Sequence, residues 1–110
     1  MVNITYIEPA GDAITLQIEA GWSLMQGAVT NGVDGIVGEC GGSCVCATCH
    51  CYVETSRLAQ LPLPNEEELE LLSWVTAERK PNSRLACQLK AGPATDGLVV
   101  TIPAVQGLRS

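Results

Sequence analysis

The sequence predicts one α+β domain, in which a main helix packs across a mixed sheet. Two observations predict this fold class: apolar and polar side chains alternate near the start of the chain, and the elements follow the order ββα–loop–β–α–ββ. A chain of 110 residues, 46% of them apolar, can bury one core but has no room for a second. We therefore expect residues 1–110 to form a single domain that is a monomer.

The chain begins with a predicted β-hairpin. Residues 2–8 and residues 14–19 each alternate apolar with polar side chains, which is typical of a half-buried strand. Between them lies Pro9-Ala10-Gly11-Asp12, a composition found in turns. The two strands are therefore expected to pair with each other.

Two short helices are predicted from their capping residues. Ser23 is the expected N-cap of a helix that runs to about Thr30 and ends at Asn31-Gly32. Its inner face is expected to hold Leu24, Ala28 and Val29. Asn65 is the expected N-cap of a second helix, with Glu68 in the capping-box position three residues later. On that helix one face is expected to hold Leu69, Leu72 and Val75, with Glu66, Glu67 and Glu70 directed elsewhere.

A long loop and three further strands complete the prediction. Residues 32–49 are dominated by Gly, Cys, Ser and Ala and show no regular period, which indicates an ordered loop. Loops of this length usually carry function. Residues 50–54, 84–89 and 98–102 are predicted to be strands of the same sheet.

The charge balance excludes two classes of partner. Twelve acidic and six basic residues give a formal net charge of −6. Nucleic acids and anionic membranes both require clustered Lys and Arg, so we expect no nucleic acid and no membrane among the partners. A basic protein surface is the complement that this charge favours. No apolar run approaches the roughly 20 residues that span a bilayer, and a strand pattern begins at Val2, so a cytoplasmic protein is expected.

Six cysteines give the strongest functional signal. Five of them lie within residues 40–51, and the sixth, Cys87, lies far along the chain. In a reducing compartment such cysteines are more often metal ligands or free thiols than disulfides. Crowded thiolates repel one another unless a cationic metal centre lies between them. Gly41 and Gly42 lack a Cβ atom, so they can bring backbone N–H groups close to sulfur.

Two other readings of the cysteines are weaker. A tetrathiolate zinc site could use Cys46 and Cys49 as a C-x2-C pair, but such sites need a second close pair and Cys87 stands alone. A thioredoxin-like role for the same pair leaves four cysteines without a role. An iron–sulfur cluster accounts best for the pattern.

The chain resembles the adrenodoxin and putidaredoxin type of 2Fe-2S ferredoxin. The spacing C-x5-C-x2-C-x37-C, formed by Cys40, Cys46, Cys49 and Cys87, matches that family and does not fit the plant-type C-x4-C-x2-C run. The likeness extends to residues 36–43, to residues 46–50 and to the segment Lys80-Pro81-Asn82-Ser83-Arg84-Leu85-Ala86-Cys87-Gln88. It covers nearly the whole chain and implies a β-grasp fold.

The resemblance also implies the cofactor and the residues around it. One 2Fe-2S cluster is expected, with Cys40, Cys46, Cys49 and Cys87 as its ligands. The residues expected to surround it are Gly41, Gly42, Ser43, Cys44, Val45, Ala47, Thr48 and His50. His50 is expected to brace the cluster loop by hydrogen bonding rather than to bind iron. Cys44 falls outside the ligand spacing, and Arg84 is expected to pair with a carboxylate of the acidic helix region.

An electron carrier, not an enzyme, is the function that this family implies. It would accept electrons from a flavin-containing (FAD-dependent) ferredoxin reductase and deliver them to a haem-thiolate (cytochrome P-450) monooxygenase. The residues expected to meet these partners are Glu39, Glu66, Glu67 and Glu70. A ferredoxin that serves iron–sulfur cluster assembly is the nearest alternative, and Cys51, directly after the histidine, resembles that branch. A zinc-binding interaction module is a third reading.

Overall fold

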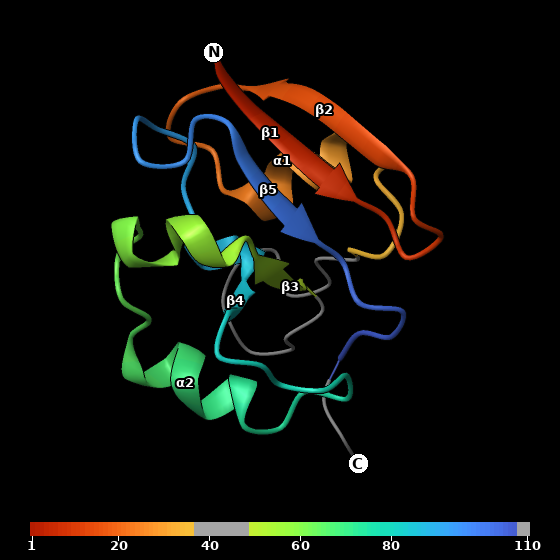
Figure 1. Ribbon diagram of the computed structural model, residues 1–110, viewed down its shortest axis with the longest axis vertical. Helices are drawn as coiled ribbons and strands as arrows, with labels where there is room; N and C mark the ends of the chain where they lie inside the picture. The colour runs from red at the N-terminus through yellow and green to blue at the C-terminus, as the bar shows by residue number, and fades with distance from the viewer. Residues whose placement is uncertain (37–48, 108–110) are drawn as a thin grey trace.

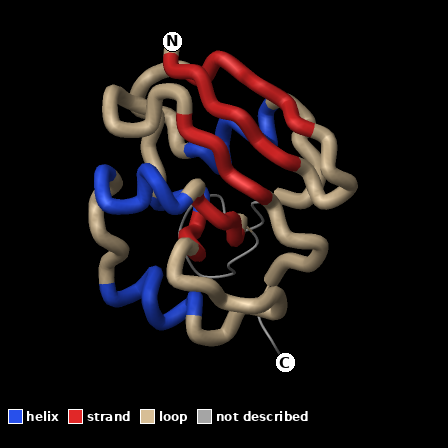
Figure 2. The backbone as a smooth tube through the Cα atoms, in the orientation of Figure 1, coloured by secondary structure: helices blue, strands red, loops and turns tan. Residues whose placement is uncertain are grey.

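The structure is a computed structural model that describes residues 1–36 and 49–107. Five strands form one mixed sheet in the order β2-β1-β5-β3-β4 (Figures 1 and 2). The strands are β1 (Val2–Ile7), β2 (Ala13–Ile18), β3 (His50–Val53), β4 (Ser83–Leu85) and β5 (Leu98–Thr101). The helices are α1 (Leu24–Thr30), α2 (Glu66–Leu72) and two 3-10 helices, η1 (Thr55–Gln60) and η2 (Ala86–Gln88). The predicted α+β class is confirmed, with the strand and helix order of a β-grasp fold.

The predicted hairpin is confirmed, and its first strand is also paired with the last strand of the chain. β1 pairs antiparallel with β2, from Val2 opposite Ile18 to Ile7 opposite Ala13. β1 also pairs parallel with β5, which returns from the far end of the chain. Alternate residues of β1 point into the core, where Ile4 and Tyr6 are fully buried. This alternation follows from the two-residue period of a strand.

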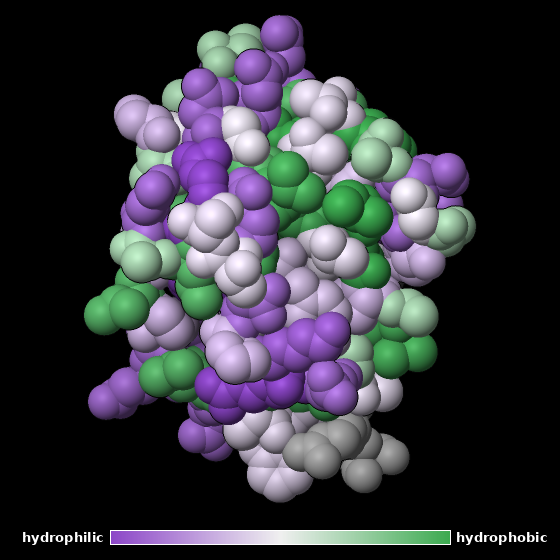
Figure 3. Space-filling view, viewed as in Figure 1, coloured by the Kyte–Doolittle hydropathy of each residue, from purple (hydrophilic) through white to green (hydrophobic). Residues whose placement is uncertain are grey.

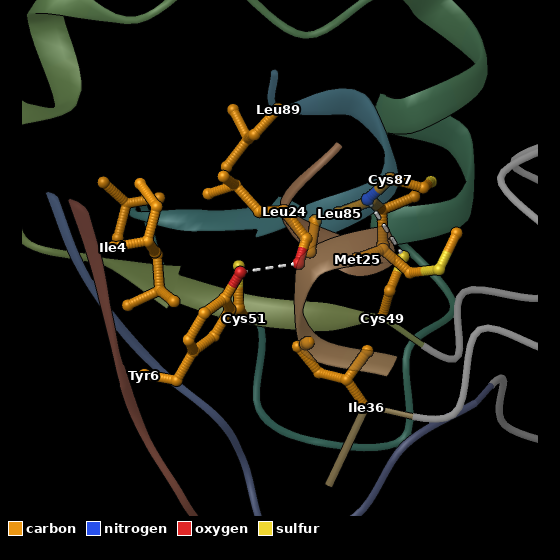
Figure 4. Packing of buried hydrophobic residues seen from close by; sticks show 14 of the residues in the cluster. Ile4, Tyr6, Leu24, Met25, Ile36, Cys49, Cys51, Leu85, Cys87 and Leu89 are labelled. Carbon is orange, nitrogen blue, oxygen red and sulfur yellow. Dashed lines mark hydrogen bonds between the residues drawn. The ribbon is translucent and has the colours of Figure 1, made fainter. Parts of the chain in front are cut away.

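Helix α1 covers one face of the sheet, as the capping residues predict (Figure 1). Ser23 accepts a hydrogen bond from the backbone N–H of Gln26, whose side chain caps the Ser23 N–H in return. The Tyr6 hydroxyl donates to the carbonyl of Leu24 at 2.8 Å, which ties the helix to the central strand (Figure 4). The prediction that Val29 faces inward is wrong, since its side chain is 44% exposed. Met25 and Gly27 are buried instead.

Helix α2 lies to the side of the sheet, next to β4 (Figure 1). Asn65 caps it by accepting a hydrogen bond from the N–H of Glu68, as predicted. The Glu68 side chain does not complete a capping box, because it turns inward and is fully buried. Leu69 does not share the buried face of Leu72, since it is 41% exposed. Glu68 occupies that face because Arg84 is there to pair with it.

The predicted strand over residues 84–89 is shorter than expected. β4 ends at Leu85, and the chain turns at once into the 3-10 helix η2. This turn moves Cys87 out of the sheet, whereas a continued strand would have kept it in the ladder. Within the described ranges, no helix is long and apolar enough to cross a membrane.

Candidate metal centre

Two of the predicted cluster ligands lie side by side in the core. Cys49 precedes β3 and Cys87 lies in η2, and both side chains are buried. The backbone N–H of Cys87 points at the sulfur of Cys49, with 3.4 Å between nitrogen and sulfur (Figure 4). The Gln88 side-chain amide donates to the Cys87 sulfur at 3.5 Å. Two sulfurs 38 residues apart in the chain are thus gathered, and each accepts an N–H hydrogen bond.

The fold holds this pair through the edge of the sheet. β3 and β4 pair antiparallel, with His50 opposite Leu85, so Cys49 and Ala86 lie just outside this ladder and Cys87 follows directly. The N–H of Ala86 donates to the carbonyl of Cys49 at 2.9 Å and closes the turn. The buried side chain of Met25 of α1 lies beside Cys49 (Figure 4). The sulfurs therefore lie in a buried apolar setting and receive one backbone and one side-chain N–H group.

The chemistry of this donor set fits an iron–sulfur cluster. The hydrogen bond with the Cys87 thiol and then burial raise the pKa of the Cys49 thiol far above its ordinary value. Without a metal the Cys49 thiol therefore stays protonated, because a buried thiolate beside a second sulfur is unfavourable. Cys49 and Cys87 would bind iron as thiolates, each giving up its proton to solvent, and the cationic iron would offset the repulsion between their charges. The N–H groups aimed at the two sulfurs would then favour the additional negative charge of a reduced cluster.

The other two predicted ligands, Cys40 and Cys46, lie outside the described residues. So do Glu39, Gly41, Gly42, Ser43, Cys44, Val45, Ala47 and Thr48. In the part of the chain that the structure describes, no three His, Cys, Asp or Glu side chains converge on one point. Of the four predicted ligands, the structure therefore describes Cys49 and Cys87.

His50 is buried next to this site and braces the sheet. Its Nε2 lies 2.9 Å from the hydroxyl of Ser83 on the neighbouring strand, and its ring meets Tyr52 edge-on. Burial lowers the pKa of His50 to about 4, so the ring is neutral near pH 7. This contact braces β3 against β4, whereas the predicted bracing of the cluster loop concerns residues outside the described ranges.

Cys51 points away from the pair of ligands. It is fully buried in β3 near Tyr6 (Figure 4). Burial first, and then the charge of Glu68, raise the pKa of its thiol to about 12. This neutral thiol packs as a small apolar side chain.

The three predicted partner-binding glutamates of α2 all face solvent. Glu66, Glu67 and Glu70 are exposed, while the fourth acidic residue of the helix, Glu68, is buried. Figure 3 shows hydrophilic side chains gathered over the lower left of the molecule, where Figure 1 places α2, with hydrophobic ones among them. The helix therefore presents an acidic outer surface.

Sequence reasoning missed two residues near the site, Glu68 and Gln106. The Glu68 carboxylate accepts from Arg84 at 2.7 and 3.0 Å and from the N–H of Leu85 at 2.9 Å. The Arg84 pairing was predicted, but its partner was not identified. Helical spacing could have found it, because residues 68, 72 and 75 repeat at intervals of four and three. The Gln106 side chain bonds to the main chain of His50, and no local pattern in the sequence signals this contact.

The chain matches known proteins over nearly all of its length. Residues 7–92 match a family model described as a 2Fe-2S iron–sulfur cluster binding domain. Putidaredoxin of Pseudomonas putida is 48% identical over 103 residues, which is 94% of this chain and 96% of that protein. A crystal structure of a reduced variant of that putidaredoxin superimposes with a TM-score of 0.91, again at 48% identity, and covers 94% of this chain and 98% of that one.

A further solved structure is similar to this chain. It is the covalent complex of putidaredoxin reductase with putidaredoxin. The match has a TM-score of 0.89 at 48% identity and covers 92% of this chain and 97% of the matched chain. Proteins of this kind carry electrons on one 2Fe-2S cluster and are not enzymes. The chain belongs to the 2Fe-2S iron–sulfur cluster binding family and is a ferredoxin of the putidaredoxin type.

Proposed function

We propose that this ferredoxin shuttles single electrons from a flavin-dependent reductase to a haem-thiolate (cytochrome P-450) monooxygenase. When bound, the 2Fe-2S cluster takes up and releases one electron. The observation that carries the proposal is the convergence of Cys49 and Cys87 at the end of β3, each with an N–H group directed at its sulfur. Cys40 and Cys46 are proposed as the remaining ligands.

The likeness to putidaredoxin supports the first half of this route. Putidaredoxin forms a covalent complex with its reductase in a solved structure, and the present chain shares its fold at 48% identity. The acidic surface of α2 supports a protein partner with a basic surface, because opposite charges steer fast and weak encounters. Exposed apolar side chains at Leu69 and Trp74, 41% and 54% exposed, add apolar area beside the glutamates.

Reconstitution tests the route directly. The loaded protein should contain equal amounts of iron and acid-labile sulfide and should support substrate turnover when combined with a ferredoxin reductase and a haem-thiolate monooxygenase. A loaded protein that is reduced normally but serves only in assembling clusters on acceptor proteins would assign the alternative role. A colourless protein that holds zinc would contradict both.

Charge reversal of the acidic helix should slow electron transfer. The Glu66→Lys/Glu67→Lys/Glu70→Lys variant should be reduced by the reductase about 10-fold or more slowly at low salt, because steering raises association rates by 10-fold to 1,000-fold. The difference should shrink as the ionic strength rises, since salt screens exposed charges. Stopped-flow reduction rates at several salt concentrations measure this effect.

The matched control for the acidic helix is a charge reversal elsewhere on the surface. Glu8→Lys/Asp12→Lys/Glu19→Lys changes the net charge by the same amount, but in and around the hairpin of β1 and β2. It should have a smaller effect than the α2 reversal at every salt concentration. Equal slowing by the two triple variants would show that only net charge matters and would contradict docking at α2.

The loop ligands provide a further test. Cys46→Ala is expected to lose the native cluster, unless Cys44 two residues earlier enters the vacancy. Cys44→Ala is the matched control and should keep both iron content and visible spectrum. The double variant, without either thiol, should bind no stable cluster. Wild-type iron content and an unchanged spectrum in Cys46→Ala would show that Cys46 is not a native ligand.

A further inference from the structure

We infer that Gln106 is a positioning residue for the ligand-bearing end of β3, where its side-chain amide takes the place of a missing stretch of backbone pairing. The inference rests on the proposed function, since it treats Cys49 as a cluster ligand. It adds a residue from the C-terminal tail to the described part of the site, which holds Cys49, His50 and Cys87.

The contact itself is a two-way hydrogen bond. The Gln106 Oε1 atom accepts from the backbone N–H of His50 at 2.9 Å, and its Nε2 atom donates to the backbone carbonyl of the same residue at 2.8 Å. Both distances are typical of strong amide hydrogen bonds. One side chain therefore satisfies both backbone groups of a residue 56 positions earlier in the chain. Bonds of this pattern are those that a neighbouring strand supplies in an antiparallel sheet.

The register of the sheet explains why a side chain is needed here. β3 pairs antiparallel with β5, with Tyr52 opposite Thr101 and Val53 opposite Val100. Continued by two residues, this register brings His50 opposite Pro103. Proline has no N–H group and cannot donate to a ladder, and β5 ends at Thr101. Gln106 therefore completes the sheet at the position where the chain of β5 cannot.

The position matters because Cys49 directly precedes His50. On the η2 side, the Cys49 carbonyl accepts from the N–H of Ala86 at 2.9 Å. On the β5 side, the same end of β3 is held by Gln106 through His50. Between these restraints the Cys49 sulfur accepts the N–H of Cys87 (Figure 4). If the Gln106 bonds are lost, the His50 backbone must find water, which brings solvent toward the sulfurs and loosens the N–H···S geometry.

A role limited to anchoring the tail is the competing explanation. The tail has a second, separate attachment, since the carbonyl of Gly107 accepts from the N–H of Thr76 at 2.9 Å. Loss of the Gln106 side chain therefore leaves the tail attached on that side. A pure anchoring role predicts a small loss of stability with no change at the cluster, whereas a positioning role predicts a change in the electronic properties of the cluster.

The test uses the loaded protein and two variants. Gln106→Ala removes both hydrogen bonds, and Gln106→Glu keeps the acceptor but lacks the donor to the His50 carbonyl. Gln60→Ala is the matched control, because Gln60 is an exposed glutamine whose side chain meets only the Arg57 side chain at 3.3 Å among the contacts of the described residues. The measurements are the reduction potential, the electron paramagnetic resonance spectrum of the reduced protein, and the rate at which a chelator bleaches the visible absorbance.

Gln106→Ala should bleach about 10-fold faster than wild type, the effect of losing two hydrogen bonds of ordinary net strength. Its reduction potential and electron paramagnetic resonance spectrum should also shift. In all three measurements Gln106→Glu should lie between Gln106→Ala and wild type, and Gln60→Ala should match wild type. If Gln106→Ala cannot be loaded, the same comparison of Gln106→Glu with Gln60→Ala decides. A wild-type reduction potential, spectrum and bleaching rate in the Gln106 variants would overturn the inference. The proposed function would still stand if the wild-type protein contains iron and acid-labile sulfide. A wild-type protein without iron and sulfide would instead overturn the proposed function.

Discussion

Arg84→Ala should lower the free energy of unfolding by about 3–5 kcal/mol, the usual cost of leaving one member of a buried ion pair without its partner. The Arg84 and Glu68 side chains are only 5% and 1% exposed, and the Nε of Arg84 lies 2.7 Å from the Glu68 carboxylate. Without the guanidinium, that carboxylate keeps the N–H of Leu85 as a donor but loses its compensating charge. The carbonyl of Pro62, which accepts from Arg84 at 2.7 Å, loses its donor as well.

Thermal unfolding at a fixed scan rate measures this loss. For a chain of this length the apparent melting temperature should fall by about 12 °C or more, in both far-ultraviolet circular dichroism and visible absorbance. Glu66→Ala is the matched control, because it removes an exposed carboxylate from the same helix and should change the stability by no more than about 0.5 kcal/mol. The double variant Glu68→Leu/Arg84→Met should recover much of the loss, because it leaves no buried charge. Equal melting temperatures for Arg84→Ala and Glu66→Ala would show that the pair contributes little.

The fold could be predicted from the sequence wherever a local pattern decides the structure. The hairpin of β1 and β2 follows from strand alternation around Pro9-Ala10-Gly11-Asp12, and both helix starts follow from their capping residues Ser23 and Asn65. Errors arose where a distant residue decides. Leu69 looked like a core residue and Glu68 like a cap, but Arg84, sixteen residues away, makes burial of the carboxylate favourable and turns the helix by one position.

The candidate site divides in the same way. Spacing and family resemblance identified Cys49 and Cys87, and the structure brings these two together. The contribution of Gln106 could not be predicted, because it depends on Pro103 lying opposite His50 in a ladder between strands that are far apart in the chain. A polar residue in a tail without any period carries no local signal. Its role becomes visible only when the pairing of β3 with β5 is known.

Cys87→Ala is expected to abolish the stable cluster. Cys87 is the one proposed ligand outside the 40–51 segment, so its loss would remove the proposed bond between η2 and the cluster. Three thiolates leave one iron position open to water or small ligands, and the cluster becomes prone to loss. The purified variant should contain less than about a tenth of the wild-type iron and acid-labile sulfide, because one lost metal bond costs more than the roughly 1.4 kcal/mol that corresponds to a factor of ten. Iron and sulfide analysis with a visible spectrum measures the change.

Cys51→Ala is the matched control for this loss. Cys51 is as deeply buried as Cys87, but its thiol lies beside Tyr6 in the core and away from the two ligands (Figure 4). Removing it should leave a small cavity and a modest loss of stability, while the iron content and the spectrum remain those of wild type. The comparison separates ligation from packing, because both variants delete one buried sulfur. Equal loss of iron in the two variants would show that core packing, and not the bond from Cys87, keeps the cluster in place. Wild-type iron content in Cys87→Ala would remove Cys87 from the ligand set.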